Sequence, residues 1–217
     1  MPSNLPNSRR TLLLRSASLI AATAAPAWLT PALAQGASLR PTPSQSEGPF
    51  YPVSLPADTD FDLLHNKNGQ GVARYTQGEA AWVEGTVVDT RGVPVAGALV
   101  EIWQCDQDGH YHHPGDGGKA NPAFQGFGRV GVGKDGAYRF RTLRPARYGG
   151  RTPHIHVKVK LDGADLLTTQ LYVAGDPANA RDFLWRRIDE RAQAAITVPF
   201  APSSDGLRAR FPIVVQT

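Results

Sequence analysis

Short runs of β-branched and aromatic residues, separated by turn residues, limit the folds open to this chain more than any other feature. Residues 81–89 are dominated by such side chains, and residues 98–104 alternate inward and outward positions as a strand does. Further runs of this kind occupy residues 137–142, 154–161, 166–173 and 211–215. Several short strands with turns between them predict an all-β fold of the sandwich type.

One segment, residues 176–191, has the spacing of a helix instead. Asp176 can cap it, and Phe183, Leu184 and Ile188 would share one buried face. The sequence therefore predicts a β-sandwich with one short helix.

Length and composition predict one folded domain with two flanking segments. A chain of 217 residues with 41% hydrophobic residues commonly forms one domain, here placed at residues 79–217. Residues 35–78 are rich in Pro, Ser and Gly and are expected to form an irregular N-terminal arm. Three of the 23 basic residues and none of the 19 acidic ones lie in residues 1–34, so the remainder is nearly neutral. This balance argues against a nucleic-acid partner.

The first 34 residues have the pattern of an export signal. Arg9 and Arg10 precede an apolar, Ala-rich stretch, which ends at the small residues Ala32-Leu33-Ala34. The paired arginines resemble the twin-arginine class of signal, which carries folded proteins. We therefore expect export to the periplasm, with only transient contact with the membrane through the signal.

Two histidines and two tyrosines form a candidate metal site. His154 and His156 are two residues apart on a predicted strand, so both side chains leave the same face and can bind one ion. Tyr148 and Arg151 precede them in a loop rich in Gly and Pro, and a second loop offers Tyr111. Such a pair also occurs as surface or hydrogen-bonded core histidines, and the spacing alone leaves this open.

The order of the motifs resembles that of the intradiol ring-cleavage dioxygenases, such as protocatechuate 3,4-dioxygenase and catechol 1,2-dioxygenase. The similarity covers most of residues 42–176. Its motifs are Gly48-Pro49, Gly85-Thr86-Val87-Val88-Asp89, Val100-Glu101-Ile102-Trp103-Gln104, Gly109-His110-Tyr111, Arg151-Thr152-Pro153-His154-Ile155-His156 and Thr169-Gln170-Leu171-Tyr172.

This resemblance implies a prealbumin-like sandwich with one non-haem Fe(3+) per chain. The implied metal ligands are Tyr111, Tyr148, His154 and His156. The implied catalytic residues are Arg151, Gln170 and Tyr148, the last as the phenolate that substrate displaces. The implied substrate-binding residues are Gly48, Pro49, Phe50, Arg151 and Gln170.

The implied activity is cleavage of a catecholic ring by O2 between its two hydroxyl-bearing carbons, giving a cis,cis-muconate-type product. This is a reaction of aromatic compound catabolism, and the size of the chain favours a protocatechuate-like substrate. Two alternatives stay open: a non-catalytic prealbumin-like binding module, and a zinc hydrolase that uses the same histidine pair. A homo-oligomer also stays open.

Overall fold

The computed structural model describes residues 38–67 and 73–217. Residues from Gly36 onward form one compact unit. The predicted export signal at residues 1–34 lies outside the described residues. No helix in the described ranges is both long and apolar enough to cross a membrane.

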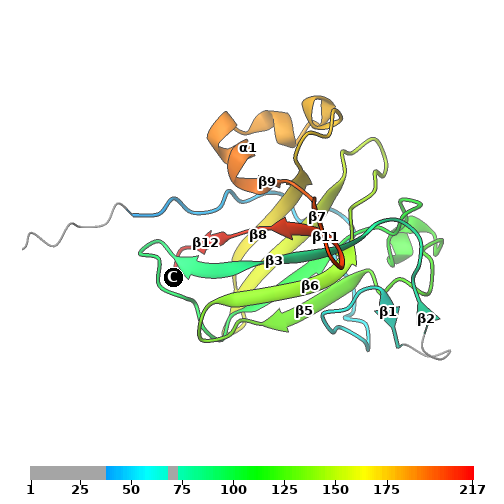
Figure 1. The fold of residues 1–217 in the computed structure, drawn as a ribbon, viewed down its shortest axis with the longest axis horizontal. Coiled ribbons are helices and arrows are strands. Elements are labelled where there is room, and N and C mark those ends of the chain that lie inside the picture. The colour runs from blue at the N-terminus through cyan, green and yellow to red at the C-terminus, as the bar shows by residue number, and fades with distance from the viewer. Residues whose placement is uncertain (1–37, 68–72) are drawn as a thin grey trace, which may run out of the picture. The chain divides into compact units, whose positions relative to one another are not determined.

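Two five-stranded sheets dominate the described part of the chain (Figure 1). One contains β3 (Ala80–Asp89), β6 (Ala137–Leu143), β10 (Ala201–Ser203), β11 (Gly206–Arg210) and β12 (Ile213–Val215). The other has the order β5 (Phe127–Gly131), β4 (Leu99–Trp103), β7 (His154–Leu161), β8 (Ala164–Val173) and β9 (Thr197–Val198). Strand β1 (His65–Asn66) pairs antiparallel with β2 (Ala73–Arg74). The prediction of an all-β sandwich is confirmed.

The inward side chains of the two sheets form the main apolar core. Val83 and Phe140 of the first sheet and Val100, Ile155 and Leu171 of the second are completely buried within it. These residues occupy alternate positions on their strands, which is why the outward positions are free to carry polar side chains. The core therefore holds β7 and β8 rigidly from one side.

The strand pairing in the first sheet explains why residue 85 is a glycine. Strand β11 and then β12 pair in parallel with successive parts of β3, and the chain crosses between them at Phe211. A Cβ atom at Gly85 would lie 2.1 Å from the carbonyl oxygen of Phe211. Only glycine allows the two backbones to approach this closely. The predicted late strand at residues 211–215 is therefore shorter, and a further strand, β11, precedes it.

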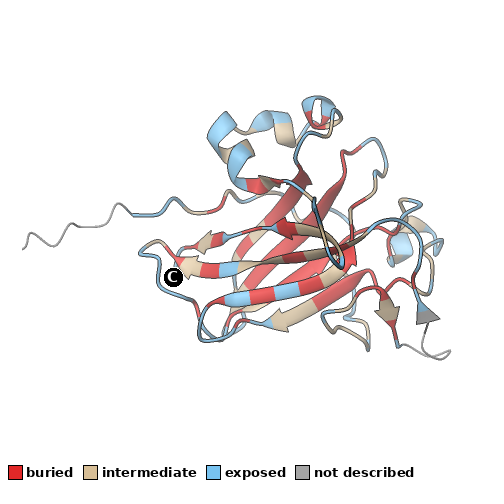
Figure 2. Ribbon diagram, viewed as in Figure 1, coloured by how far each residue is buried: buried red, intermediate tan, exposed pale blue. Residues whose placement is uncertain are grey.

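Strands β7 and β8 are buried on both faces. Figure 2 shows them buried along most of their length, whereas β6 alternates between buried and exposed positions. The covering element is the predicted N-terminal arm: Gln45 N–H donates to the carbonyl of Thr168 (2.8 Å), and Glu47 forms an ion pair with Lys158. The outer face of this sheet is thus polar and yet shielded from water.

The prediction of one short helix is confirmed, but its predicted position at residues 176–191 is wrong. That region contains two 3-10 turns, η2 (Asn179–Arg181) and η3 (Trp185–Arg187), and then α1 (Glu190–Ile196), which Asp189 caps. A third 3-10 turn, η1 (Pro114–Asp116), lies in the loop after β4. Phe183 is 55% exposed instead of packing on a buried helix face. The cause is Asp182, whose buried carboxylate accepts hydrogen bonds from N–H groups that follow it and so competes with the helix.

Candidate metal centre and active site

Strand β7 places two histidines on the outer face of its sheet. His154 and His156 are each 1% exposed. Trp103 of β4 lies opposite His156 in the antiparallel pairing, and its ring stacks on the imidazole with centroids 4.8 Å apart and planes at 9°. The stacked indole fixes the plane of the His156 ring.

The two imidazoles face each other through their Nε2 atoms. The Nδ1 atom of His154 lies 2.6 Å from the carbonyl oxygen of Thr152, which can only accept, so Nδ1 carries the proton and Nε2 a lone pair. The Nε2 atoms of His154 and His156 are 3.2 Å apart. Two nitrogens that each bind one ion at about 2.1 Å are about 3 Å apart when they meet it at a right angle. The observed spacing fits one shared ion.

Both histidines are held in the neutral form. Burial lowers the pKa of His154 to about 4, with a smaller contribution from the charge of Arg151. Burial, followed by the neighbouring His154, also lowers the pKa of His156 well below its ordinary value. At neutral pH each ring therefore keeps the lone pair that a metal needs.

Tyr111 brings a buried phenol to the same place from the loop after β4. Its backbone N–H donates to Asp116 Oδ2 (2.9 Å), and Phe50 stacks on its ring at 4.6 Å. Its ring centroid lies 6.0 Å from that of His156. The hydroxyl is buried and has no hydrogen-bond partner among the described residues. Burial raises the pKa of Tyr111 well above its ordinary value, so without a cation the phenol keeps its proton.

Tyr148 completes the group from the loop before β7. Its ring centroid is 4.9 Å from that of Tyr111 and 5.6 Å from that of His154. A tight turn fixes it, because Arg151 N–H donates to its carbonyl (2.7 Å) while Gly149 and Gly150 adopt φ values of 49° and 80°. Tyr148 is only half-buried. Burial raises its pKa, and the nearby charge of Arg151 opposes that effect.

These four donors fit a hard, highly charged cation. A trivalent ion can replace the phenolic proton and so lower a tyrosine pKa, which accounts for the unpartnered Tyr111 hydroxyl on a ring beside the neutral His156. Structural and hydrolytic zinc sites draw on His, Cys, Asp and Glu, and no group of three or more of these residues converges anywhere in the described ranges. The donor set therefore fits iron(III) better than zinc.

Arg151 and Gln170 lie beside the histidines in one hydrogen-bonded network. Gln170 is opposite His156 in the pairing of β7 with β8. Its Oε1 accepts from Arg151 Nη2 (2.7 Å), and its Nε2 donates to the carbonyl of Ser46 (2.9 Å). Arg151 also donates through Nε to Asp182 Oδ2 (2.6 Å). The structure thus directs a guanidinium toward the outer face of the sheet and holds it from several sides.

The arm supplies one wall of this site. Gly48 adopts a φ of 76°, and a Cβ atom there would lie 3.3 Å from Cε1 of His156. Phe50 contacts Tyr111 face to face and Tyr148 edge to face, with a centroid distance of 5.5 Å to the latter. Pro49 between them is exposed. Gly48 therefore lies against His156, and Phe50 lies against Tyr111 and Tyr148.

Sequence reasoning missed two neighbours of the site. Trp103 was given no role at the site from the sequence, yet its ring stacks on His156. Asp182, whose side chain is 0% exposed, was not singled out from the sequence. No periodicity marks Asp182. The one available signal was that a buried arginine needs an acidic partner somewhere in the chain.

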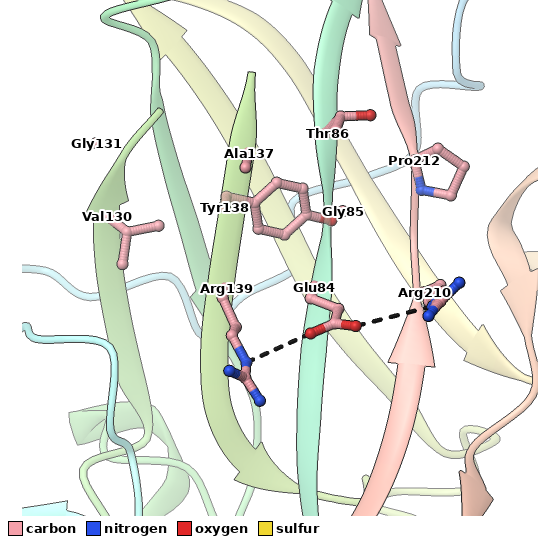
Figure 3. Close-up of a pocket in the computed structure, with 10 residues that line it drawn as sticks. All are labelled: Glu84, Gly85, Thr86, Val130, Gly131, Ala137, Tyr138, Arg139, Arg210 and Pro212. Carbon is pink, nitrogen blue, oxygen red and sulfur yellow. Dashed lines mark ion pairs between the residues drawn. The ribbon is translucent and has the colours of Figure 1, made fainter. Parts of the chain in front are cut away.

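Open space lies on two sides of the candidate site. A depression of about 260 Å³ is lined by Tyr148, Arg151, Ala178 and Arg181, and a smaller one of about 120 Å³ reaches Phe50 and Tyr111. A larger cavity of about 630 Å³ lies elsewhere, against β3, β5 and β6 (Figure 3). Its ionic groups pair with one another, since Glu84 contacts Arg139 at 3.3 Å and Arg210 at 3.8 Å. It contains no histidine and none of the four candidate donors.

Comparison with known proteins places this chain in a family. A profile of the family described as "Dioxygenase" matches residues 46–217. The hydroxyquinol 1,2-dioxygenase of Corynebacterium glutamicum is 32% identical over 202 residues, covering 77% of this chain and 61% of that enzyme. The beta chain of protocatechuate 3,4-dioxygenase from Burkholderia cepacia is 34% identical over 165 residues, covering 70% of this chain and 68% of that one. The chain belongs to the intradiol ring-cleavage dioxygenase family.

Solved structures share the fold. The dioxygenase domain of a dioxygenase carbohydrate-binding protein fusion from Streptomyces sp. SirexAA-E matches with a TM-score of 0.65 and 32% identity, covering 82% of this chain and 99% of that one. The hydroxyquinol 1,2-dioxygenase of Pseudomonas putida DLL-E4 matches with a TM-score of 0.62 and 21% identity, covering 83% of this chain and 68% of that one. The second similarity concerns the fold alone.

Proposed function

We propose that this protein is a non-haem iron(III) dioxygenase that cleaves a catecholic ring between its two hydroxyl-bearing carbons, giving a cis,cis-muconate-type product. The observation that carries the proposal is the convergence of the Tyr111 hydroxyl, without a partner in the described chain, with the facing Nε2 atoms of His154 and His156. Tyr148 is the fourth proposed ligand. When bound, iron(III) supplies the positive charge that ionises the phenols and draws electron density from a coordinated catechol.

The surrounding side chains perform the remaining tasks. Tyr148 is half-buried on a turn while the histidines are fixed on a strand, so Tyr148 is the ligand that can leave to make room for substrate. Arg151 places a permanent positive charge where negative charge develops on the ring, and Gln170 holds its direction. Phe50 and Trp103 keep water from Tyr111 and His156.

The substrate is proposed as a class. Relatives carry the names hydroxyquinol, catechol and protocatechuate dioxygenase, so they do not single out the protocatechuate-like substrate that chain size favoured. The turn between Tyr148 and His154 is short, which supports an open mouth that tolerates substituents on the ring. The proposed substrates are therefore catecholic rings together with O2.

We also propose that residues 1–34 direct export of the folded, iron-loaded protein to the periplasm. The support is the order of Arg9-Arg10, the apolar stretch and Ala32-Leu33-Ala34. Tyr111 is distant in sequence from the other three proposed ligands and meets them only in the fold. A pathway that carries folded protein would preserve the bound metal.

Metal analysis combined with a visible spectrum tests the proposed site. The purified protein should hold one iron per chain and be red-brown, because phenolate transfers charge to iron(III). Tyr148→Phe should keep iron, shift the colour and slow turnover. The matched control Tyr138→Phe, whose hydroxyl donates to Phe211 far from the site, should keep the wild-type colour. A colourless zinc protein would favour the hydrolase, and a metal-free protein that binds no iron would favour a binding module.

A further inference from the structure

The segment between β8 and α1 buries one carboxylate beneath Arg151. Asp182 Oδ2 accepts from Arg151 Nε at 2.6 Å, and Asp182 Oδ1 lies 3.4 Å from Arg151 Nη2. The side chains of Asp182 and Arg151 are 0% and 9% exposed. Gln170 and Tyr172 also accept from this guanidinium, and both are neutral. Asp182 is thus the one carboxylate paired with Arg151 in the part of the chain that the structure describes.

The same carboxylate also holds the peptide that orients a histidine. Thr152 N–H donates to Asp182 Oδ2 at 3.1 Å, and the carbonyl of Thr152 accepts from His154 Nδ1 at 2.6 Å. The N–H groups of Leu184 and Trp185 each donate to Asp182 Oδ1 at 3.0 Å. Five donors in all converge on Asp182, counting Arg151 Nη2. This number of bonds makes its position rigid, and rigidity is what a support for a charged group requires.

We propose that Asp182 is a positioning residue for the ring-cleavage reaction: it fixes the direction of the Arg151 guanidinium and, through Thr152, the backbone next to His154. This inference rests on the proposed function. Asp182 is completely buried beneath Arg151, so it does not touch substrate and acts through the arginine. Without its charge, Arg151 would lose its one carboxylate partner in the described chain and would turn toward solvent past the exposed ring of Phe183, 5.3 Å away.

A double-mutant cycle tests whether Asp182 acts through Arg151. Removing the charge of Arg151 by Arg151→Gln should lower kcat by about 100-fold, the usual effect of losing one placed charge. Asp182→Asn should lower kcat at least about tenfold with KM within about threefold, because the charge is still present but misdirected. The double variant should be within about threefold of Arg151→Gln alone. A merely structural role would instead make the two effects multiply, and that result overturns the proposal.

Two controls keep the cycle interpretable. Asp176→Asn removes the nearby ion pair with Arg147, whose side chain is 52% exposed, and should leave kcat and KM unchanged. The double variant leaves no unpaired buried charge, so it should fold even if Asp182→Asn does not. Its kcat compared with that of Arg151→Gln then decides the question.

Arginine Nε–H resonances give a readout that needs neither iron nor turnover. In metal-free protein labelled with 15N, the Arg151 Nε–H signal, identified by its absence in Arg151→Gln, should exchange slowly with solvent. Asp182→Asn should make it exchange at least tenfold faster, and Asp176→Asn should not. Unchanged protection in Asp182→Asn overturns the proposal. If iron-loaded wild type cleaves no catechol, the proposed function fails, and this signal still decides whether Asp182 holds Arg151.

Discussion

The unpartnered hydroxyl of Tyr111 predicts that removing it stabilises the metal-free protein. The side chain is 2% exposed, and burial keeps the phenol protonated, so a donor is buried without an acceptor in the described residues. A buried polar group in this state costs about 1–3 kcal/mol. Tyr111→Phe removes the hydroxyl and keeps the ring that stacks on Phe50 at 4.6 Å.

We therefore expect metal-free Tyr111→Phe to be more stable than wild type by about 1–2 kcal/mol, which raises Tm by about 2–8 °C in a chain of this size. The matched control is Tyr138→Phe, whose hydroxyl is also buried but donates to the carbonyl of Phe211 at 2.6 Å. Losing that bond should destabilise the protein by about 1 kcal/mol. The two substitutions remove the same atom and should change the free energy of unfolding in opposite directions.

Calorimetry and urea denaturation of the metal-free proteins measure this difference. Adding iron should then make wild type more stable than Tyr111→Phe. A ligand that binds only the folded state stabilises wild type by mass action, and Tyr111→Phe binds iron weakly. If Tyr111→Phe destabilised the metal-free protein as much as Tyr138→Phe does, the hydroxyl would have a structural partner. The argument for a built metal site would then fail.

Three further predictions concern the ligands, acid stability and export. His156→Ala should lose iron, measured by metal analysis, since no donor in the described part of the chain lies where its Nε2 was; a variant that kept iron and activity would contradict the ligand set. Burial raises the pKa of Asp182, but hydrogen bonds from Arg151 and from Trp185 and Thr152 N–H outweigh it and leave the pKa below its ordinary value. The ionised Asp182 therefore stabilises the folded state above about pH 4, and this stabilisation is lost as the pH falls through the lowered pKa of Asp182. Wild type should therefore lose more stability than Asp182→Asn in urea titrations between about pH 4 and pH 2. Changing Arg9 and Arg10 to Lys should leave the protein inside the cell in fractionation experiments, and unaltered export would exclude the twin-arginine pathway.

The strands and the candidate donors were predictable because their signals are local. Residues 81–89 and 154–161 have the composition and alternation of strands, and both contain the observed strands almost to their ends. His154 and His156 are two residues apart on a strand, so they lie on the same face of the sheet regardless of the rest of the fold. Tyr111 and Tyr148 followed only from the order of motifs, since a loop sequence does not specify which way a phenol points.

The rest depended on contacts between distant segments. Apolar spacing at Phe183, Leu184 and Ile188 suggested a helix, but Asp182 binds the following N–H groups and the buried Arg151, and these bonds replace the helical ones. The arm gave no local pattern because its conformation is set by the sheet that it covers, for example where Gln170 donates to the carbonyl of Ser46. Neither interaction has a periodicity that the sequence alone could show.

Product analysis tests the proposed function most directly. Purified iron-loaded protein should be mixed with catechol, hydroxyquinol and protocatechuate in air, and the products separated and identified by mass and absorbance. Iron(III) with two phenolates activates the ring for cleavage between its hydroxyl-bearing carbons, so a cis,cis-muconate-type acid should form from at least one substrate, and Arg151→Gln should form it far more slowly. A yellow semialdehyde, the product of cleavage beside the hydroxyls, would contradict the account.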